Sequence, residues 1–181
     1  MEQLSNIITD YLNRLSVAYA TALSTGNATP ELSFRPVLNS FFDEVKELFG
    51  KDIQNIFEPR TQGKYGRPDW MFSNANTMGV YGYVEAKGFN PDKLLAPKDY
   101  EAQVKRYLYL GNPVILTDGI DFIVYQPNGE SEMVSVCRKP INWRELQPNT
   151  DILPMFREFF REEGFIDAKI GIYSQIAKAL Y

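Results

Sequence analysis

Two acidic residues and a lysine stand close together in an otherwise apolar, strand-like part of the sequence. Asp69 follows Pro68, and the triplet Glu85-Ala86-Lys87 ends the next strand-like run. Side chains alternate along a strand, so Glu85 and Lys87 should point to one face while Ala86 packs on the other. Mg²⁺ is bound through one or two carboxylates and water, and a lysine beside it suits phosphodiester hydrolysis, because its charge stabilises negative charge that develops on the phosphate.

Other interpretations fit the same residues. A surface ion pair on a β-hairpin would also place an acid beside a lysine, and the spacing between Asp69 and Glu85 is loose. A pair of glycosidase carboxylates is a third interpretation, with Trp70 available to stack on a sugar. Trp70 should, however, point away from Asp69, and Lys87 beside Glu85 disfavours a glycosidase.

The composition excludes several kinds of chemistry. The 181 residues include no histidine, which removes the usual general base, imidazole zinc sites and Ser-His-Asp triads. Cys137 is the only cysteine, so no intrachain disulfide forms. The formal net charge of -4 argues against non-specific coating of nucleic acid, although local clusters of cations can still bind phosphate. The groups that remain available for catalysis are carboxylates, lysine, hydroxyls and a bound metal.

Length and hydropathy predict one domain over residues 1–181. Apolar residues make up 44% of the chain and aromatic residues 14%, enough for a sizeable core. No apolar run approaches the roughly 20 residues of a membrane span, and residues 1–9 lack the features of a signal peptide. We therefore expect a cytoplasmic protein with no membrane partner.

Hydrophobic periodicity predicts the elements that must position these residues. Three-and-four spacing indicates helices at 2–23, 30–49, 99–110, 152–163 and 168–180. Apolar runs predict strands at 52–57, 68–73, 79–86, 112–117, 122–126 and 132–138. The polar connection 74–77 favours antiparallel pairing of its two neighbours. The predicted fold is α/β, a mixed central sheet flanked by helices.

The order of these motifs resembles a known family. Pro68-Asp69 with Glu85-Ala86-Lys87 resembles the PD-(D/E)xK nuclease motif, and Gln103 to Tyr107 is similar to its Q-x-x-x-Y element. Glu31 matches the position of a helical glutamate that precedes the motif. The finer sequence resembles the N-terminal nuclease domain of single-chain type ISP and type IIG restriction-modification enzymes in the segments PELSFR (30–35), GRPD (66–69), GYVEAK (82–87) and NPVILTDG (112–119).

This resemblance implies a restriction-endonuclease-like core at about 30–140, with the helix 2–23 before it and the helices 152–180 after it. It further implies an Mg²⁺-dependent endonuclease that cleaves double-stranded DNA, with Mn²⁺ able to replace Mg²⁺. Such a domain would be the cleavage part of a longer chain with helicase-like or methyltransferase domains, although this sequence contains no Asn-Pro-Pro-Tyr motif or P-loop. The alternative is a non-catalytic DNA-binding or interaction module that retains the fold; the intact motif favours the enzyme.

The resemblance also assigns roles to individual residues. Asp69 and Glu85 would bind Mg²⁺, and Lys87 would position the attacking water or stabilise the phosphate. Glu31 would support the metal from its helix, or would simply be an acid stabilised by the helix dipole. Gln103 would help to hold the scissile strand or the water.

Contacts with DNA are expected from local cations. Arg60, Lys64 and Arg67 share a glycine-containing loop just before Asp69. The helix 99–110 and the loop before it supply a second strip, comprising Lys93, Lys98, Lys105, Arg106 and Tyr107. Solvated charges and a tyrosine at the edge of the core are the simpler alternatives. Nothing resembles a base-reading module, so we expect backbone binding with little sequence preference.

Overall fold

A six-stranded mixed sheet forms the centre of the computed structural model, which describes residues 2–25, 30–50 and 52–161, without the side chains of residues 25 and 30–32. The strands lie in chain order: β1 (Ile53–Phe57), β2 (Trp70–Asn74), β3 (Val80–Ala86), β4 (Val114–Thr117), β5 (Asp121–Tyr125) and β6 (Ser131–Ser135). All neighbours pair antiparallel except β3 and β4, which are parallel. The predicted mixed α/β sheet is confirmed, including the antiparallel pairing of β2 with β3.

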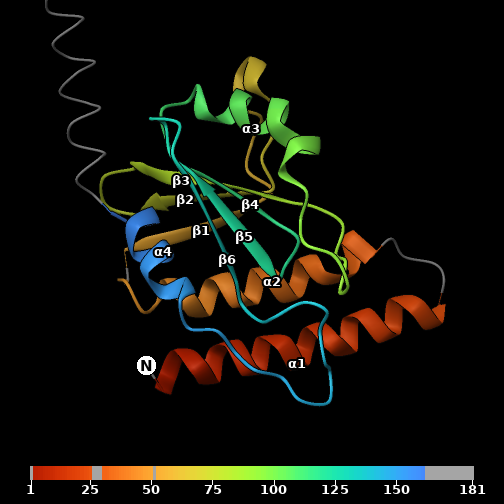
Figure 1. Ribbon diagram of the computed structural model, residues 1–181. Helices are drawn as coiled ribbons and strands as arrows, with labels where there is room; N and C mark the ends of the chain where they lie inside the picture. The colour runs from red at the N-terminus through yellow and green to blue at the C-terminus, as the bar shows by residue number, and fades with distance from the viewer. Residues whose placement is uncertain (1, 26–29, 51, 162–181) are drawn as a thin grey trace, which may run out of the picture.

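The parallel pair requires the chain to cross over between β3 and β4. The crossover contains a short 3-10 helix, η2 (Pro97–Tyr100), and the helix α3 (Glu101–Leu108). Val104 and Tyr107 of α3 pack on Val114 and Leu116 of β4, so α3 covers one face of the sheet (Figure 1). The helix that carries Gln103 is therefore fixed beside the end of β3.

The opposite face of the sheet is covered by three helices, α1 (Glu2–Thr25), α2 (Pro30–Lys46) and α4 (Ile152–Phe159) (Figure 1). Their core is largely aromatic and includes Phe41, Phe42, Phe72, Phe122 and Phe156. The predicted second helix ran to residue 49, but residues 47–49 form a turn, and the predicted helix 168–180 lies outside the described residues. Among the residues that the structure describes, no helix is both long and apolar enough to cross a membrane.

Gly82 allows α4 and the start of β4 to approach β3 closely. A Cβ atom at this position would lie 2.5 Å from a ring carbon of Phe159 and 2.6 Å from the carbonyl oxygen of Pro113. No side chain fits at such distances, because the nearest atoms belong to a buried ring and to backbone. The glycine thus brings α4 and the start of β4 directly against the central strand.

A buried ion cluster anchors the first part of the crossover. The side chain of Lys139 is 1% exposed, pairs with Asp118, and donates to Asp121 at 2.9 Å and to the carbonyl oxygen of Lys93 at 2.9 Å. Asp121 also accepts the backbone N–H of Leu95 at 2.8 Å. The cluster therefore ties residues 93–95, which lead toward α3, to the turn between β4 and β5.

Replacing this lysine should destabilise the fold. Lys139→Met leaves Asp118 and Asp121 buried without a cation, so we expect the free energy of unfolding to fall by about 3–5 kcal/mol. Urea denaturation followed by circular dichroism measures this change. Lys105→Met is the control, because the Lys105–Glu101 pair is exposed and its loss should change stability little. Equal losses for the two variants would contradict the prediction.

Candidate active site

Antiparallel pairing of β2 and β3 brings Asp69 and Glu85 together. Trp70 lies opposite Val84, so Asp69, one residue before β2, falls beside the end of β3. The Asp69 N–H donates to the Val84 carbonyl at 3.1 Å, and its carboxylate Oδ2 accepts the Ala86 N–H at 2.9 Å. Asp69 is thus held across the end of β3.

The side chains of β3 alternate between the two faces as predicted. Val84 and Ala86 belong to the core under α2, whereas Glu85 and Lys87 both contact Gln103 of α3. Trp70 points into the core under α2, where its Nε1–H donates to Asn39 at 2.9 Å. Its ring is therefore unavailable for stacking on a sugar, which removes the main support for the glycosidase interpretation.

Glu85, Lys87 and Gln103 form a closed polar triangle. Lys87 Nζ donates to Glu85 Oε1 at 2.8 Å and to Gln103 Oε1 at 2.7 Å, while Gln103 Nε2 donates to Glu85 Oε1 at 2.6 Å. The ammonium group also lies 5.0 Å from the ring centre of Tyr100. The side chains of Lys87 and Glu85 are only 13% and 7% exposed, so this is not the solvated surface pair of the simpler interpretation.

The two carboxylates, Asp69 and Glu85, both have surroundings in which a bound cation would be favourable. Glu85 Oε2 is buried and has no hydrogen-bond partner among the described residues. Burial, followed by repulsion from Glu85, raises the pKa of Asp69 to about 6. In the part of the chain that the structure describes, no group of three or more acidic, histidine or cysteine side chains could hold a metal. Two carboxylates completed by water are nevertheless the donors that Mg²⁺ accepts, so the residues present fit such an ion.

Arg35 of α2 is a site residue that the sequence analysis missed. Its Nη2 lies 2.9 Å from Asp69 Oδ1, and the two side chains are 16% and 12% exposed. A usable signal was present, because Arg35 follows Glu31 by four positions and therefore shares its helix face. Glu31 itself is the second residue of α2, but its side chain lies outside the described part of the structure, and its supporting role stays a prediction.

The loop before Asp69 is held by two of the predicted DNA-contacting residues. Arg67 donates to the Glu58 carboxylate at 2.9 Å and to the carbonyl oxygens of Glu58 and Pro59. Tyr107 is 2% exposed, and its hydroxyl donates to the Arg67 carbonyl at 3.0 Å. Tyr107 therefore shapes the loop from the edge of the core, and a direct contact of its hydroxyl with DNA does not fit this burial.

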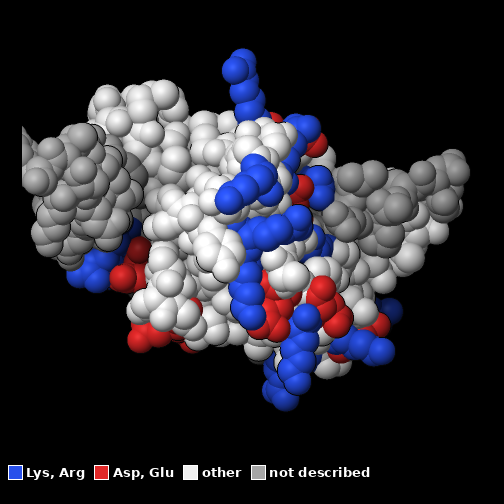
Figure 2. Space-filling model, turned by 90° about the horizontal axis from the view of Figure 1, so that it is seen from above, with Lys and Arg blue, Asp and Glu red and all other residues white. Residues whose placement is uncertain are grey.

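The remaining predicted cations lie on the surface around the site. Arg60, Lys64, Lys105 and Arg106 are all exposed, as are Lys93 and Lys98 in the crossover. Lys64 lies over the ring of Tyr65 at 5.3 Å, and Lys105 pairs with Glu101. Seen from the α3 end of the molecule, Lys and Arg side chains gather in a band across the surface, with some Asp and Glu side chains between them (Figure 2). This band is the surface best suited to a phosphate backbone.

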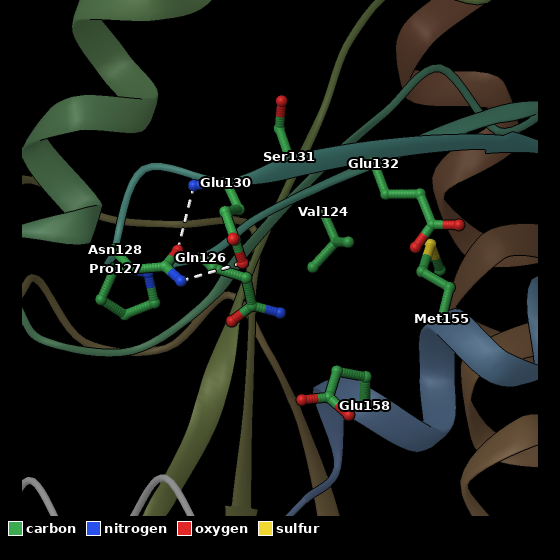
Figure 3. A pocket seen from close by; sticks show the side chains of 9 residues that line it. All are labelled: Val124, Gln126, Pro127, Asn128, Glu130, Ser131, Glu132, Met155 and Glu158. Carbon is green, nitrogen blue, oxygen red and sulfur yellow. Dashed lines mark hydrogen bonds between the residues drawn. The ribbon is translucent and has the colours of Figure 1, made fainter.

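A separate hollow of about 610 Å³ lies between β5, β6 and α4 (Figure 3). It shares no residue with the Asp69–Glu85 site. Its described lining residues include three glutamates and no cation: Val124, Gln126, Pro127, Asn128, Glu130, Ser131, Glu132, Met155 and Glu158. Its carboxylates would repel a phosphate backbone. The candidate site is therefore the polar corner at the end of β3.

Comparison with known proteins supports the fold. No family model and no curated protein matches the chain. One solved structure that it resembles is a protein called DrdV, determined by cryo-electron microscopy in complex with DNA. The match has a TM-score of 0.50 at 16% sequence identity and covers 70% of this chain and 12% of the DrdV chain. At this identity the similarity concerns the fold alone, and it agrees with the predicted restriction-endonuclease-like core.

The raised pKa of Asp69 predicts a pH dependence of stability without metal. The folded state binds this proton more tightly than the unfolded state, so the Asp69 contribution is fully present below its ordinary pKa of 3.8 and is lost as the pH rises through about 6. We expect wild type to lose stability relative to Asp69→Asn across this window. Urea denaturation of both proteins in a chelator, at several pH values, measures the difference. A difference that does not change with pH would contradict the assignment.

Proposed function

We propose that this chain is a metal-dependent nuclease domain that hydrolyses phosphodiester bonds of double-stranded DNA. The observation that carries the proposal is the corner where Asp69 and a buried, unpartnered oxygen of Glu85 meet the Lys87–Gln103 pair. Two hard oxygen donors and one adjacent ammonium group form the set that phosphodiester hydrolysis needs. Buried polar atoms are normally hydrogen-bonded, so an unpartnered carboxylate oxygen next to a second carboxylate supports a role beyond the fold.

Each residue has a distinct task in this proposal. Asp69 and Glu85 hold a divalent cation, Mg²⁺ or Mn²⁺, which supplies a Lewis acid and lowers the pKa of water when it is bound. Gln103 fixes Lys87 by accepting from its ammonium group, so that the positive charge stays beside the carboxylates. Lys87 stabilises negative charge on the phosphate as the bond breaks and orients the attacking water. Tyr107 and Arg67 hold the loop before Asp69 in place through hydrogen bonds to backbone carbonyls.

DNA is the proposed substrate because exposed cations lie on the loop that precedes Asp69 and on α3, the helix that carries Gln103. Such cations bind phosphates without reading bases, so cleavage specificity would come from other domains. The DrdV chain with which this fold matches is much longer and was solved with DNA. We accordingly propose that the domain works as the cleavage part of a restriction-modification enzyme with helicase-like or methyltransferase domains. A non-catalytic module with this fold is the alternative, since a fold alone does not determine function.

Cleavage of supercoiled plasmid tests the enzyme directly. We expect nicking or linearisation with Mg²⁺ or Mn²⁺, none with EDTA, and a loss of about 100-fold or more in rate for Lys87→Ala, because the charge beside the phosphate disappears. Arg157→Ala is the control, because Arg157 is exposed on α4 at the opposite face. Thermal melting must show that both variants remain folded. Metal-dependent cleavage that survives in Lys87→Ala would place the active site elsewhere.

The surface cations should determine the salt dependence of DNA binding. We expect the double variant Arg60→Gln, Lys64→Gln to bind a duplex more weakly and to reduce the slope of log affinity against log salt by about 1 to 2. Fluorescence anisotropy of a labelled duplex in EDTA measures both quantities without cleavage. Arg157→Gln should leave them unchanged. An unaltered slope in the double variant would remove this loop from the DNA-binding surface.

A further inference from the structure

Arg35 occupies an oxygen that the proposed function assigns to the metal ion. Its Nη2 lies 2.9 Å from Asp69 Oδ1, while Asp69 Oδ2 accepts the Ala86 N–H at 2.9 Å. Both oxygens of this carboxylate therefore have partners before any metal binds. Glu85 is different, since its buried Oε2 has no hydrogen-bond partner among the described residues. A cation that enters the site meets an open oxygen on Glu85 and an occupied one on Asp69.

Among the side chains that the structure describes, the two ion pairs of the corner carry equal numbers of positive and negative charges without a metal. When ionised, Asp69 and Glu85 carry two negative charges, and Arg35 and Lys87 carry two positive charges next to them. A divalent ion would raise the net charge by two in a place where water screens poorly, so its entry alone is unfavourable. The phosphate groups of a nucleic acid bring negative charge that offsets this excess. Metal and nucleic acid should therefore favour each other's binding.

We propose that Arg35 holds Asp69 in place of the metal ion and keeps metal binding weak until a phosphate backbone enters the site. The inference rests on the proposed function and concerns how that site is loaded. A guanidinium group that leaves Asp69 can donate two parallel hydrogen bonds to a phosphate, so the exchange replaces one anionic partner with another. Reciprocity then requires the metal to tighten nucleic-acid binding by the same factor as the nucleic acid tightens metal binding. Arg35 is thus a positioning residue that couples the two ligands.

A plain structural role for Arg35 makes a different prediction. If the ion pair only fastens α2 to the start of β2, its loss should lower stability and leave metal affinity unchanged. If Arg35 competes with the metal, its loss should raise metal affinity even where stability falls. Metal affinity in the absence of nucleic acid therefore separates the two roles.

Calorimetric titration of Mn²⁺ into the full chain, with no DNA present, measures this affinity. We expect Arg35→Gln to bind Mn²⁺ at least about fivefold more tightly than wild type, and Arg35→Lys, which keeps the charge, to stay near wild type. Arg14→Gln is the matched control, because Arg14 pairs with Asp10 and Glu44 between α1 and α2, without contact with Asp69 or Glu85. Equal or weaker Mn²⁺ binding by Arg35→Gln would overturn the proposal.

A second titration tests the coupling itself. Ca²⁺ is titrated with and without a saturating DNA duplex that a gel shows to remain intact. The duplex should tighten Ca²⁺ binding to wild type by a larger factor than to Arg35→Gln, and equal factors would overturn the coupling. If neither wild type nor Arg35→Gln binds metal, with or without the duplex, the proposed function is refuted as well. Metal-dependent cleavage together with an unchanged affinity of Arg35→Gln would remove only the role of Arg35.

A measurement on wild type keeps the proposal testable if Arg35→Gln does not fold. The Nε–Hε signal of Arg35 in a nitrogen-proton NMR spectrum reports on the partner of its guanidinium group. We expect this signal to shift when Mg²⁺ and a short duplex are added together. A signal that stays in place at saturation would show that Arg35 never leaves Asp69, and would overturn the exchange.

Discussion

Asp69 and Glu85 are held close together in a corner that water hardly reaches, and the repulsion between them has to be offset by positive charge. Arg35 supplies one charge from α2, and Lys87 supplies the other from the end of β3. Gln103 of α3 satisfies both Glu85 and Lys87, so its amide keeps the acid and the base in one arrangement. Much of the surrounding architecture can be understood as the support of these few groups. Without it, the carboxylates would separate or become protonated.

The parallel pairing of β3 with β4 provides much of that support. A crossover is needed to return the chain to the start of β4, and this crossover contains the helix α3 that presents Gln103. Lys139, Asp118 and Asp121 fasten the first part of the crossover from within the molecule. Buried ion clusters of this kind add little net stability. Here, however, Lys139 and Asp121 bond to the backbone of residues 93 and 95 and so fix the start of the crossover. The position of Gln103 therefore depends on residues that take no part in the proposed chemistry.

Local patterns were sufficient to predict the strands, the alternation at Glu85 and Lys87, and the orientation of Trp70. Each of these features follows from the period of a strand, which the sequence displays directly. The partner of Asp69 could not be predicted in this way, because Arg35 lies far away in the chain and meets it only through the packing of α2. Arg67 and Tyr107 show the same limit. Their types suggested contacts with DNA, which stay a prediction, but not their contacts within the fold, where Tyr107 binds the Arg67 carbonyl and Arg67 binds the Pro59 carbonyl.

Gly82 couples the position of α4 to the position of β3. With no side chain at this position, the Phe159 ring of α4 presses on the backbone of β3 a few residues before Glu85. The aromatic core and the polar corner lie on opposite faces of the sheet, and β3 contributes side chains to both. A shift of α4 must be absorbed by β3, because the contact leaves no free space. A larger residue at Gly82 would consequently push β3 and α4 apart. This would displace Glu85 and disturb the site without any change to a charged residue.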